Sequence, residues 1–322
     1  MKRILIIDAL NLYYRSYIVD PSISLNGQPI GGLKGFLKSL QKYARETNPD
    51  EIVICWDGEG GSRRRKAQHK GYKEGRKPIR LNRSIRNLNE EQEIENKIWQ
   101  QLRLVEYLNE MPVIQLMLPN VEADDLIALA VHLPEYAGYQ KVILSSDKDF
   151  YQLCNDKTIL IRPVQKVVMN QNKVIEDFGI HPNNFALARA IVGDKSDNID
   201  GIRGAGLSTV AKRFPFLRKE KSFAITDIFK HCKKQEKKLL IHERIRENKS
   251  VVQNNYKLMQ LYSPSISPQG TAAMRQKLRH WNRSFNKTGV ITMMFKDGIG
   301  EYNWLDLWGR FNKIVWESKS PF

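Results

Sequence analysis

Residues 3–8 read RILIID, an unbroken apolar run that ends in a carboxylate. Three later runs share this apolar character and are short enough to be buried parallel strands, at 52–56, 113–118 and 142–145. Segments with apolar residues at helical spacing separate the runs, at 35–45, 90–109 and 124–132. This alternation predicts an α/β fold with a central, mostly parallel sheet flanked by helices.

Acidic residues follow each of the predicted strands. In chain order they are Asp8, Asp57, Glu122, Asp124, Asp125, Asp147 and Asp149. A further pair, Asp194 and Asp197, comes after a helical segment at 185–192. Because ligands bind beyond the carboxyl ends of parallel strands, we expect these nine carboxylates to converge at one edge of the sheet.

Nine carboxylates in a partly desolvated cleft repel one another strongly unless cations are bound between them. A ligand set of oxygen atoms, without His or Cys, favours Mg²⁺ or Mn²⁺. Two such ions, roughly 4 Å apart, can activate water and stabilise charge on a phosphate. A single Asp at a strand end is usually a solvated turn residue or a helix cap, so the hypothesis of phosphodiester hydrolysis depends on the whole set.

The overall charge points to a polyanionic partner. The 322 residues carry a net charge of +17, which favours nucleic acid over an anionic membrane surface. We find neither an export signal nor an apolar run of roughly 18 residues, and therefore expect a cytoplasmic protein without a membrane partner. Three widely spaced cysteines are interpreted as reduced and structural, at 55, 154 and 232. No clustered His ligands and no GxxxxGK[ST] motif occur, which argues against His general-base chemistry and against ATP use.

Charge and composition change twice along the chain. Between residues 62 and 86, eleven Lys and Arg residues meet a single acid, which predicts a mobile arm or arch. The final segment contains Trp281, Trp304, Trp308 and Trp316, which predict a folded appendage with a small core of its own. We therefore divide the chain into a nuclease-type core at 1–200 that includes the arch, a basic helical region at 201–262 and a C-terminal appendage at 263–322.

Five motifs occur in a fixed order along residues 4–214. They are Ile7-Asp8 with Asn11 and Arg15, Trp56-Asp57, Val121-Glu122-Ala123-Asp124-Asp125, Ser145-Ser146-Asp147-Lys148-Asp149-Phe150, and Gly193-Asp194-Lys195-Ser196-Asp197-Asn198. Together they resemble the 5′-nuclease family, which includes flap endonucleases, the nuclease domain of bacterial DNA polymerase I and bacteriophage 5′-exonucleases and ribonucleases H. The resemblance implies one metal group around Asp8, Asp57, Glu122 and Asp124, and a second around Asp125, Asp147, Asp149, Asp194 and Asp197. It also implies that Arg15 binds nucleic acid.

The segment Tyr72-Lys73-Glu74-Gly75-Arg76 resembles the Tyr-Lys-x-x-Arg segment of the helical arch in this family. The resemblance implies that Lys73 and Arg76 contact the scissile phosphate and act in catalysis with Asp8, Asp57, Asp124 and Asp147. A cation beside a transferring phosphoryl group stabilises developing charge. Tyr72 is left with two interpretations, stacking on a base or packing within the arch.

Residues 201–211, GIRGAGLSTVA, resemble the helix-hairpin-helix variant of the same family. Glycines allow backbone amides to approach a phosphate, and the following helix offers its positive end. We therefore expect duplex DNA to bind at Gly201, Gly204, Gly206, Ser208 and Thr209, with K⁺ as a further candidate ligand of this hairpin. Ser208 is interpreted as the helix N-cap, and a dinucleotide-binding loop is disfavoured because these glycines do not follow a strand.

The resemblance implies a monomeric, metal-dependent 5′-nuclease that removes primers from RNA–DNA or DNA duplexes during replication, in a bacteriophage or a bacterium. The C-terminal Trp residues are expected to pack in a core, with docking of a single-stranded-DNA-binding protein or other replication proteins as the alternative. Two other functions stay open: a PIN-type ribonuclease and a non-catalytic, structure-specific DNA-binding protein. The long arch and the glycine hairpin argue against the first, and the intact carboxylate set argues against the second.

Overall fold

The computed structural model describes the chain except residues 235–238, 280, 282–283, 301 and 320–322. Its centre is a six-stranded sheet in the order β3-β2-β1-β4-β5-β6. The strands are β1 (Arg3–Asp8), β2 (Glu51–Cys55), β3 (Ile114–Leu116), β4 (Gln140–Leu144), β5 (Thr158–Arg162) and β6 (Val167–Met169). All neighbours pair in parallel except β5 and β6. The predicted α/β fold is confirmed, while β5 and the antiparallel β6 were not predicted.

Alternating side chains of the sheet enter two separate hydrophobic clusters. On β1, Ile4 and Ile6 belong to one cluster, whereas Leu5 and Ile7 belong to the other. Successive residues of a strand point to opposite faces, so a continuous apolar run is the expected sequence of a strand that is covered on both sides. All four of these side chains are fully buried.

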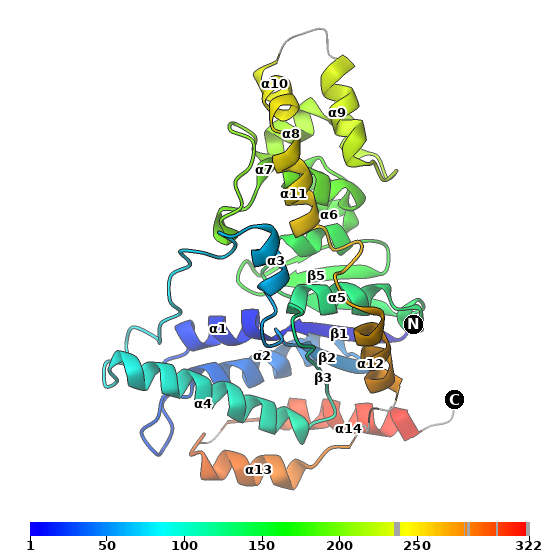
Figure 1. The fold of residues 1–322 in the computed structure, drawn as a ribbon. Coiled ribbons are helices and arrows are strands. Elements are labelled where there is room, and N and C mark those ends of the chain that lie inside the picture. The colour runs from blue at the N-terminus through cyan, green and yellow to red at the C-terminus, as the bar shows by residue number, and fades with distance from the viewer. Residues whose placement is uncertain (235–238, 280, 282–283, 301, 320–322) are drawn as a thin grey trace.

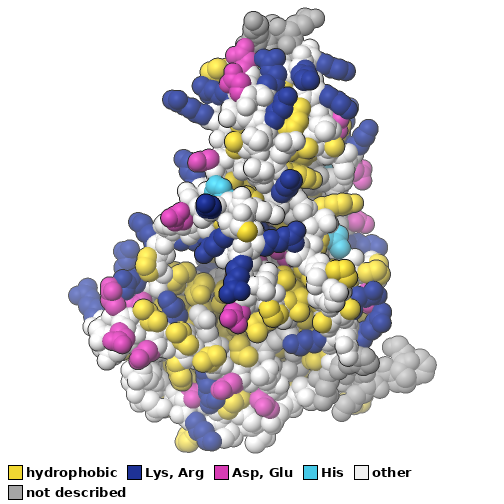
Figure 2. Space-filling view, in the orientation of Figure 1, with side chains coloured by type: hydrophobic (Ala, Val, Ile, Leu, Met, Phe, Trp, Pro, Cys, Tyr) yellow, Lys and Arg dark blue, Asp and Glu magenta, His cyan; other side chains and the backbone are white. Residues whose placement is uncertain are grey.

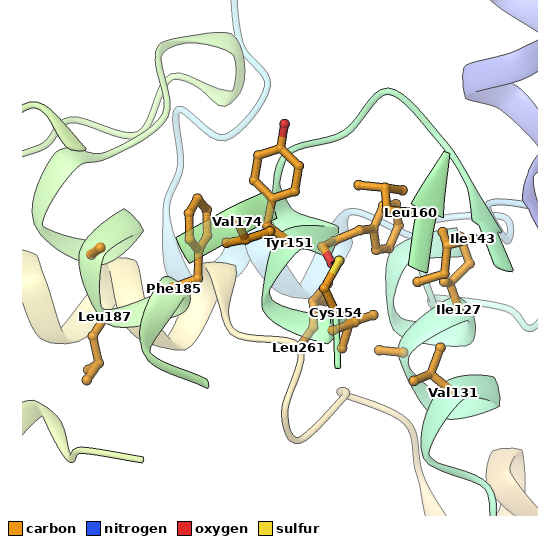
Figure 3. Packing of buried hydrophobic residues seen from close by; sticks show 14 of the residues in the cluster. Ile127, Val131, Ile143, Tyr151, Cys154, Leu160, Val174, Phe185, Leu187 and Leu261 are labelled. Carbon is orange, nitrogen blue, oxygen red and sulfur yellow. The ribbon is translucent and has the colours of Figure 1, made fainter. Parts of the chain in front are cut away.

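Helices from distant parts of the chain cover the two faces. One cluster includes α1 (Ala9–Val19), α2 (Gly31–Thr47) and α4 (Glu90–Asn109), and α4 begins at a capping box between Asn89 and Gln92. The other includes α5 (Ala123–His132), α6 (Gln171–Phe178) and α7 (Phe185–Val192). Figure 3 shows this second cluster, in which Ile127 and Val131 of α5 lie beside strand residues Ile143 and Leu160.

A narrower helical region rises from one end of the sheet (Figure 1). It contains α8 (Leu207–Arg213), α9 (Ile225–Lys234), α10 (Leu240–Glu247) and α11 (Lys249–Met259). Helix α11 packs along α7, and Asn255 of α11 donates hydrogen bonds to the carbonyls of Ala190 and Asp200. These bonds tie the basic region to the loop that carries Asp194 and Asp197.

The C-terminal helices return to the sheet. They are α12 (Pro268–Arg279), α13 (Lys287–Lys296) and α14 (Leu305–Lys319), and α14 packs on α2 at the base of Figure 1. The expectation of a separate small core is wrong, because Trp304 and Trp308 belong to the same cluster as Leu5 and Ile7. Trp281 packs at the edge of both large clusters, whereas Trp316 is 77% exposed. The predicted core packing thus holds for three of the four Trp residues.

Two further sequence interpretations can be compared with the described residues. The three cysteines are free and buried, as predicted for structural thiols. Within the described part of the chain, no helix combines the length and the apolar character that a membrane crossing requires.

Candidate active site

Predicted metal ligands lie at the carboxyl edge of the sheet, where β1 is flanked by β2 on one side and by β4, from a later part of the chain, on the other. Asp8 is the last residue of β1 and the N-cap of α1, and Asp147 follows the neighbouring strand β4. Asp57 lies just beyond β2, and its Oδ1 accepts a hydrogen bond from the amide of Ala123 at the start of α5. A junction of this kind is where open α/β sheets place their ligands.

Short hydrogen bonds fix the orientation of these carboxylates. The hydroxyl of Ser145 donates to Oδ2 of Asp8 at 2.8 Å, and the amide of Asn11 donates to Oδ1. Asn11 in turn accepts a bond from the amide of Ser146, which joins the start of α1 to the loop after β4. The amide of Asp149 donates to Oδ1 of Asp147 at 2.7 Å. The backbone of the loops therefore holds the acids in place.

Burial and neighbouring carboxylates raise the pKa values of four acids at this edge. Burial, together with the charge of Asp124, raises the pKa of Asp8 to about 7. Burial also raises the pKa of Asp124 to about 6, although Arg65 and Lys73 oppose the shift. Burial and then Asp149 raise the pKa of Asp147, while burial outweighs Arg189 in raising that of Asp149. Desolvation and like charge both favour the neutral acid.

The second group of acids is held by an arginine that the sequence interpretation missed. Arg189 of α7 pairs through Nε with Asp149 at 2.8 Å and through Nη2 with Asp194. Burial acts to raise the pKa of Asp194, but the hydrogen bonds from Ser196 and the charge of Arg189 lower it overall. Arg189 is the only charged residue of the otherwise apolar helix at 185–192, a signal that could have identified it.

The basic arch lies directly on the acidic edge. It begins with α3 (Arg63–Gln68) and continues through turns, so only its first part is helical. Lys73 pairs with Glu122 at 2.5 Å, and Arg76 pairs with Asp197. The backbone amide of Lys73 also donates to the carbonyl of Asp197. Both predicted catalytic cations thus contact predicted metal ligands, and their role at a substrate phosphate stays a prediction.

Arg65 is the second residue that the sequence interpretation missed. Its guanidinium pairs with Glu122 and, at 3.3 Å, with Asp125, while its Nε donates to the carbonyl of Leu258 at the end of α11. Asp125 also accepts a hydrogen bond from the amide of Ser265, so both of its oxygens have partners. Arg65 lies in a run of four cationic residues, and nothing in the sequence distinguishes it from Arg63, Arg64 or Lys66.

The arrangement of the acids and the chemistry of their oxygen atoms bear on whether divalent cations can bind at this edge. Within the described ranges, no group of three or more His, Cys, Asp or Glu side chains is arranged so that it could hold a metal ion. Protein cations occupy the space between carboxylates instead, since Arg65, Lys73, Arg76 and Arg189 all pair with the acids. The chemistry of the donors nevertheless fits hard divalent cations, because every candidate ligand is a carboxylate oxygen and several are desolvated beside like charges.

Tyr72 and Arg15, two residues predicted to contact nucleic acid, differ in how deeply they are buried. Tyr72 is 3% exposed, packs with Ile199, Leu258 and Met259, and donates its hydroxyl to Glu122, which favours the packing interpretation over base stacking. Arg15 of α1 is half-buried. Its contact with nucleic acid stays a prediction.

The glycine hairpin has one position that is open to a phosphate. A side chain at Gly201 would collide with the carbonyl of Val192, so this glycine serves a close backbone approach. Gly204 has a φ of +83°, which L side chains rarely adopt. A Cβ at Gly206 would meet nothing within 4 Å, and this glycine is the N-cap of α8, so the interpretation of Ser208 as N-cap is wrong. Ser208 is exposed and Thr209 half-buried within the first turn.

A sequence model of one protein family matches more than half of the chain. The match covers residues 3–179, and the family is described as the 5′-3′ exonuclease, N-terminal resolvase-like domain. The chain belongs to this family. The expected resemblance is confirmed, and the matched region contains the predicted strands, the arch and seven of the nine acids.

Two curated relatives differ in how much of their length the chain spans. The 5′-3′ exonuclease of Aquifex aeolicus is 29% identical over 269 residues, with 82% of this chain and 83% of the relative covered. The thermostable DNA polymerase I of Thermus aquaticus is 31% identical over 212 residues, which are 65% of this chain but only 23% of the relative. This exonuclease-family chain therefore spans about a quarter of the polymerase.

One solved structure extends the similarity of fold beyond the matched region. It is the bacteriophage T5 flap endonuclease, crystallised as a complex with DNA and metal ions. The TM-score is 0.63 at 17% sequence identity, and the alignment covers 92% of this chain and 98% of the T5 chain. At this level of identity the similarity is one of fold, and it extends over more of the chain than the family match does.

Proposed function

We propose that the chain is a structure-specific 5′-nuclease that hydrolyses phosphodiester bonds in DNA or RNA–DNA duplexes near a 5′ end. One observation carries the proposal: a basic arch makes direct ion pairs with carboxylates at the carboxyl edge of the sheet. An acidic edge alone repels a polyanion, whereas cations placed among the carboxylates allow a phosphate to approach. The family match, the exonuclease name of the Aquifex relative and the DNA complex of the T5 enzyme support it.

Two Mg²⁺ or Mn²⁺ ions are the proposed cofactors. Asp8, Asp57, Glu122 and Asp124 form the first proposed ligand group, and Asp125, Asp147, Asp149, Asp194 and Asp197 form the second. Bound divalent cations supply Lewis acidity that lowers the pKa of water and stabilises charge on a phosphate. K⁺ at the glycine hairpin is a further candidate, since Gly206 leaves open space beside the start of α8.

The chain's own residues position the substrate. Lys73 and Arg76 hold Glu122 and Asp197 in the free protein, and an entering phosphate competes with these carboxylates for the same two cations. When Lys73 and Arg76 pair with the phosphate, they would stabilise its charge. Glu122 and Asp197 would then be free to bind metal ions. The hairpin at 201–211 and α8 would hold the duplex through its backbone, which carries little sequence information.

Each of the three regions of the chain has a proposed role. Residues 1–200 would carry catalysis, 201–262 would bind duplex and 263–322 would complete the fold. Branched or 5′-ended DNA and RNA–DNA hybrids are the proposed substrates, for a monomer that removes primers in the cytoplasm.

The experiment is a cleavage assay with end-labelled 5′-flap, nicked and RNA-primed duplexes, beside single-stranded RNA, in MgCl₂ and in EDTA. We expect cuts near the 5′ end of at least one duplex class in MgCl₂ and none in EDTA. Cleavage of single-stranded RNA with every duplex left intact would contradict the proposal and favour a PIN-type ribonuclease.

A further inference from the structure

A groove outside the acidic edge runs between α3 and α11. Its walls are formed by Arg64 and Gln68 of α3 and by Tyr256 and Lys257 of α11, and the segment that leads to α12 closes its third side with Tyr262. The groove encloses about 540 Å³ and continues past Gln68 and Lys257 into a narrower part of about 260 Å³. It lies in the range of volumes that is typical of ligand sites.

The groove is cationic. Arg64 and Lys257 are exposed on its two walls, and neither makes an ion pair with any described residue. Among the described residues, no Asp or Glu lines the wide part, while the floor of the adjoining cleft contains Asp125, whose charge Arg65 compensates. Figure 2 shows Lys and Arg side chains over the region where α3 and α11 lie in Figure 1. The unpaired cations favour an anionic ligand.

Aromatic side chains beside these cations narrow the class of ligand. Tyr262 is 81% exposed, and its ring meets that of His132 edge-on at 6.3 Å between centroids. Tyr256 is half-buried in the same groove. Duplex DNA bound by its backbone requires cations but no exposed aromatic face, whereas unpaired bases stack on such faces. Cations together with an exposed tyrosine therefore indicate single-stranded nucleic acid.

The groove lies next to the acidic edge. Arg64 lines the groove, and its neighbour Arg65 pairs with Glu122 of the acidic edge. Arg65 and Asp125 line a small adjoining cleft, together with Arg64, Gln68 and Lys257 of the groove. A strand that leaves the acidic edge beneath α3 would thus reach Lys257 and Tyr262 next. Tyr262 offers the stacking surface that the buried Tyr72 does not.

We propose that this groove binds the unpaired single strand of the substrate, through Arg64, Lys257 and Tyr262. The inference rests on the proposed function, because it assigns a second contact to the same branched substrate. Its consequence is selectivity: the groove strengthens binding of a duplex that carries a 5′ single strand, and leaves binding of the same duplex without that strand unchanged.

The test is fluorescence anisotropy with the full chain in CaCl₂, using one duplex with a 5′ single-stranded flap and the same duplex without it. Lys257→Glu and Tyr262→Ala should each weaken binding of the flap duplex about tenfold and that of the plain duplex by less than twofold. Tyr262→Phe should restore the affinity, since the ring is kept. The control is Lys287→Glu, the same charge change at an exposed position of α13, which should affect both substrates equally and slightly.

Equal weakening of both duplexes by Lys257→Glu, or wild-type affinity of both groove variants for the flap duplex, would overturn the inference. The measurement involves no cleavage, so it separates the two proposals. A wild-type chain that prefers the flap duplex through these residues but cuts nothing would reject the proposed function and retain the groove. If the wild-type chain cuts flaps and the groove variants bind the flap duplex normally, the proposed function is retained and the groove inference is rejected.

Discussion

The acidic edge and the C-terminal base of the molecule contribute to the fold in opposite ways. At the base, Trp308, Leu307 and Phe311 of α14 are buried with the side chains of β1, so their burial stabilises the sheet. At the edge, burial and then the charges of neighbouring carboxylates raise the pKa values of Asp8 and Asp147, so both groups resist ionisation in the folded protein. The fold therefore tolerates an edge where buried carboxylates lower stability, because apolar packing at the base stabilises the same sheet.

The largest effect should come from Asp147→Asn. Cleavage of a flap duplex should fall by about 10³-fold or more, because losing one charged ligand of a two-cation site removes several kcal/mol of transition-state stabilisation. The melting temperature of the metal-free protein should stay the same or rise, since repulsion with Asp149 and Asp124 is relieved. Single-turnover rates measure cleavage, and calorimetry measures the melting temperature. A variant that is both inactive and strongly destabilised would contradict the expectation that Asp147 lowers the stability of the metal-free protein.

Substitutions at the C-terminal base should lower stability and leave cleavage unchanged, which is the opposite of the result expected for Asp147→Asn. Trp308→Ala should lower the free energy of unfolding by about 3–5 kcal/mol, as is typical of a large buried side chain, and leave the rate per folded molecule unchanged. Trp316→Ala is the matched control on the same helix, because that side chain is 77% exposed and should change stability very little. Urea denaturation measures both. Equal losses in the two variants would show that burial at the base is not what stabilises α14.

Arg189→Met should produce a smaller loss that depends on metal. Removing this arginine leaves Asp149 and Asp194 without their shared counter-charge, which should lower the stability of the metal-free protein by about 2–4 kcal/mol. Saturating MgCl₂ should restore part of that loss if the two acids bind a cation. Thermal unfolding with and without MgCl₂ tests this, and a deficit that MgCl₂ does not reduce would argue against a metal site at these two acids.

The smallest expected effect is on the pH dependence of stability. Asp8 has a pKa of about 7 in the folded protein and near 4 in the unfolded chain, so the folded state binds more protons between these values. The contribution of Asp8 is therefore favourable at low pH and is lost as the pH rises towards 7. Metal-free wild type should lose more stability than Asp8→Asn between pH 5 and 8. Parallel curves for the two proteins would contradict the shift.

The sequence predicts the strand ends well because a buried parallel strand is a continuous apolar run that ends in a polar residue. Asp8, Asp57 and Asp147 could therefore be placed at one edge before the structure was known. Strand β6 was missed because it has three residues, of which Val167 and Val168 are exposed. Strand β5 is a largely buried apolar run that the sequence interpretation overlooked. The packing of α14 on α2 was equally inaccessible, since an apolar helix face does not reveal its partner.

At the site, the sequence supplied the acids but not their partners. Lys73 and Arg76 were found through a motif, whereas Arg65 has three cationic neighbours that resemble it in every respect visible in the sequence. Its role depends on which direction α3 faces, a tertiary property. Arg189 could have been recognised as a lone charge in an apolar helix, because such a residue requires buried acidic partners.

Counting bound Mn²⁺ shows whether the acidic edge is a divalent-cation site whose carboxylates the arch compensates in the free protein. Electron paramagnetic resonance of free Mn²⁺ during titration of the full chain gives the number of ions bound. We expect two bound ions per wild-type chain in the presence of a flap duplex, and fewer for Asp147→Asn. No binding by wild type beyond that of the duplex alone, at Mn²⁺ concentrations that support cleavage, would contradict it.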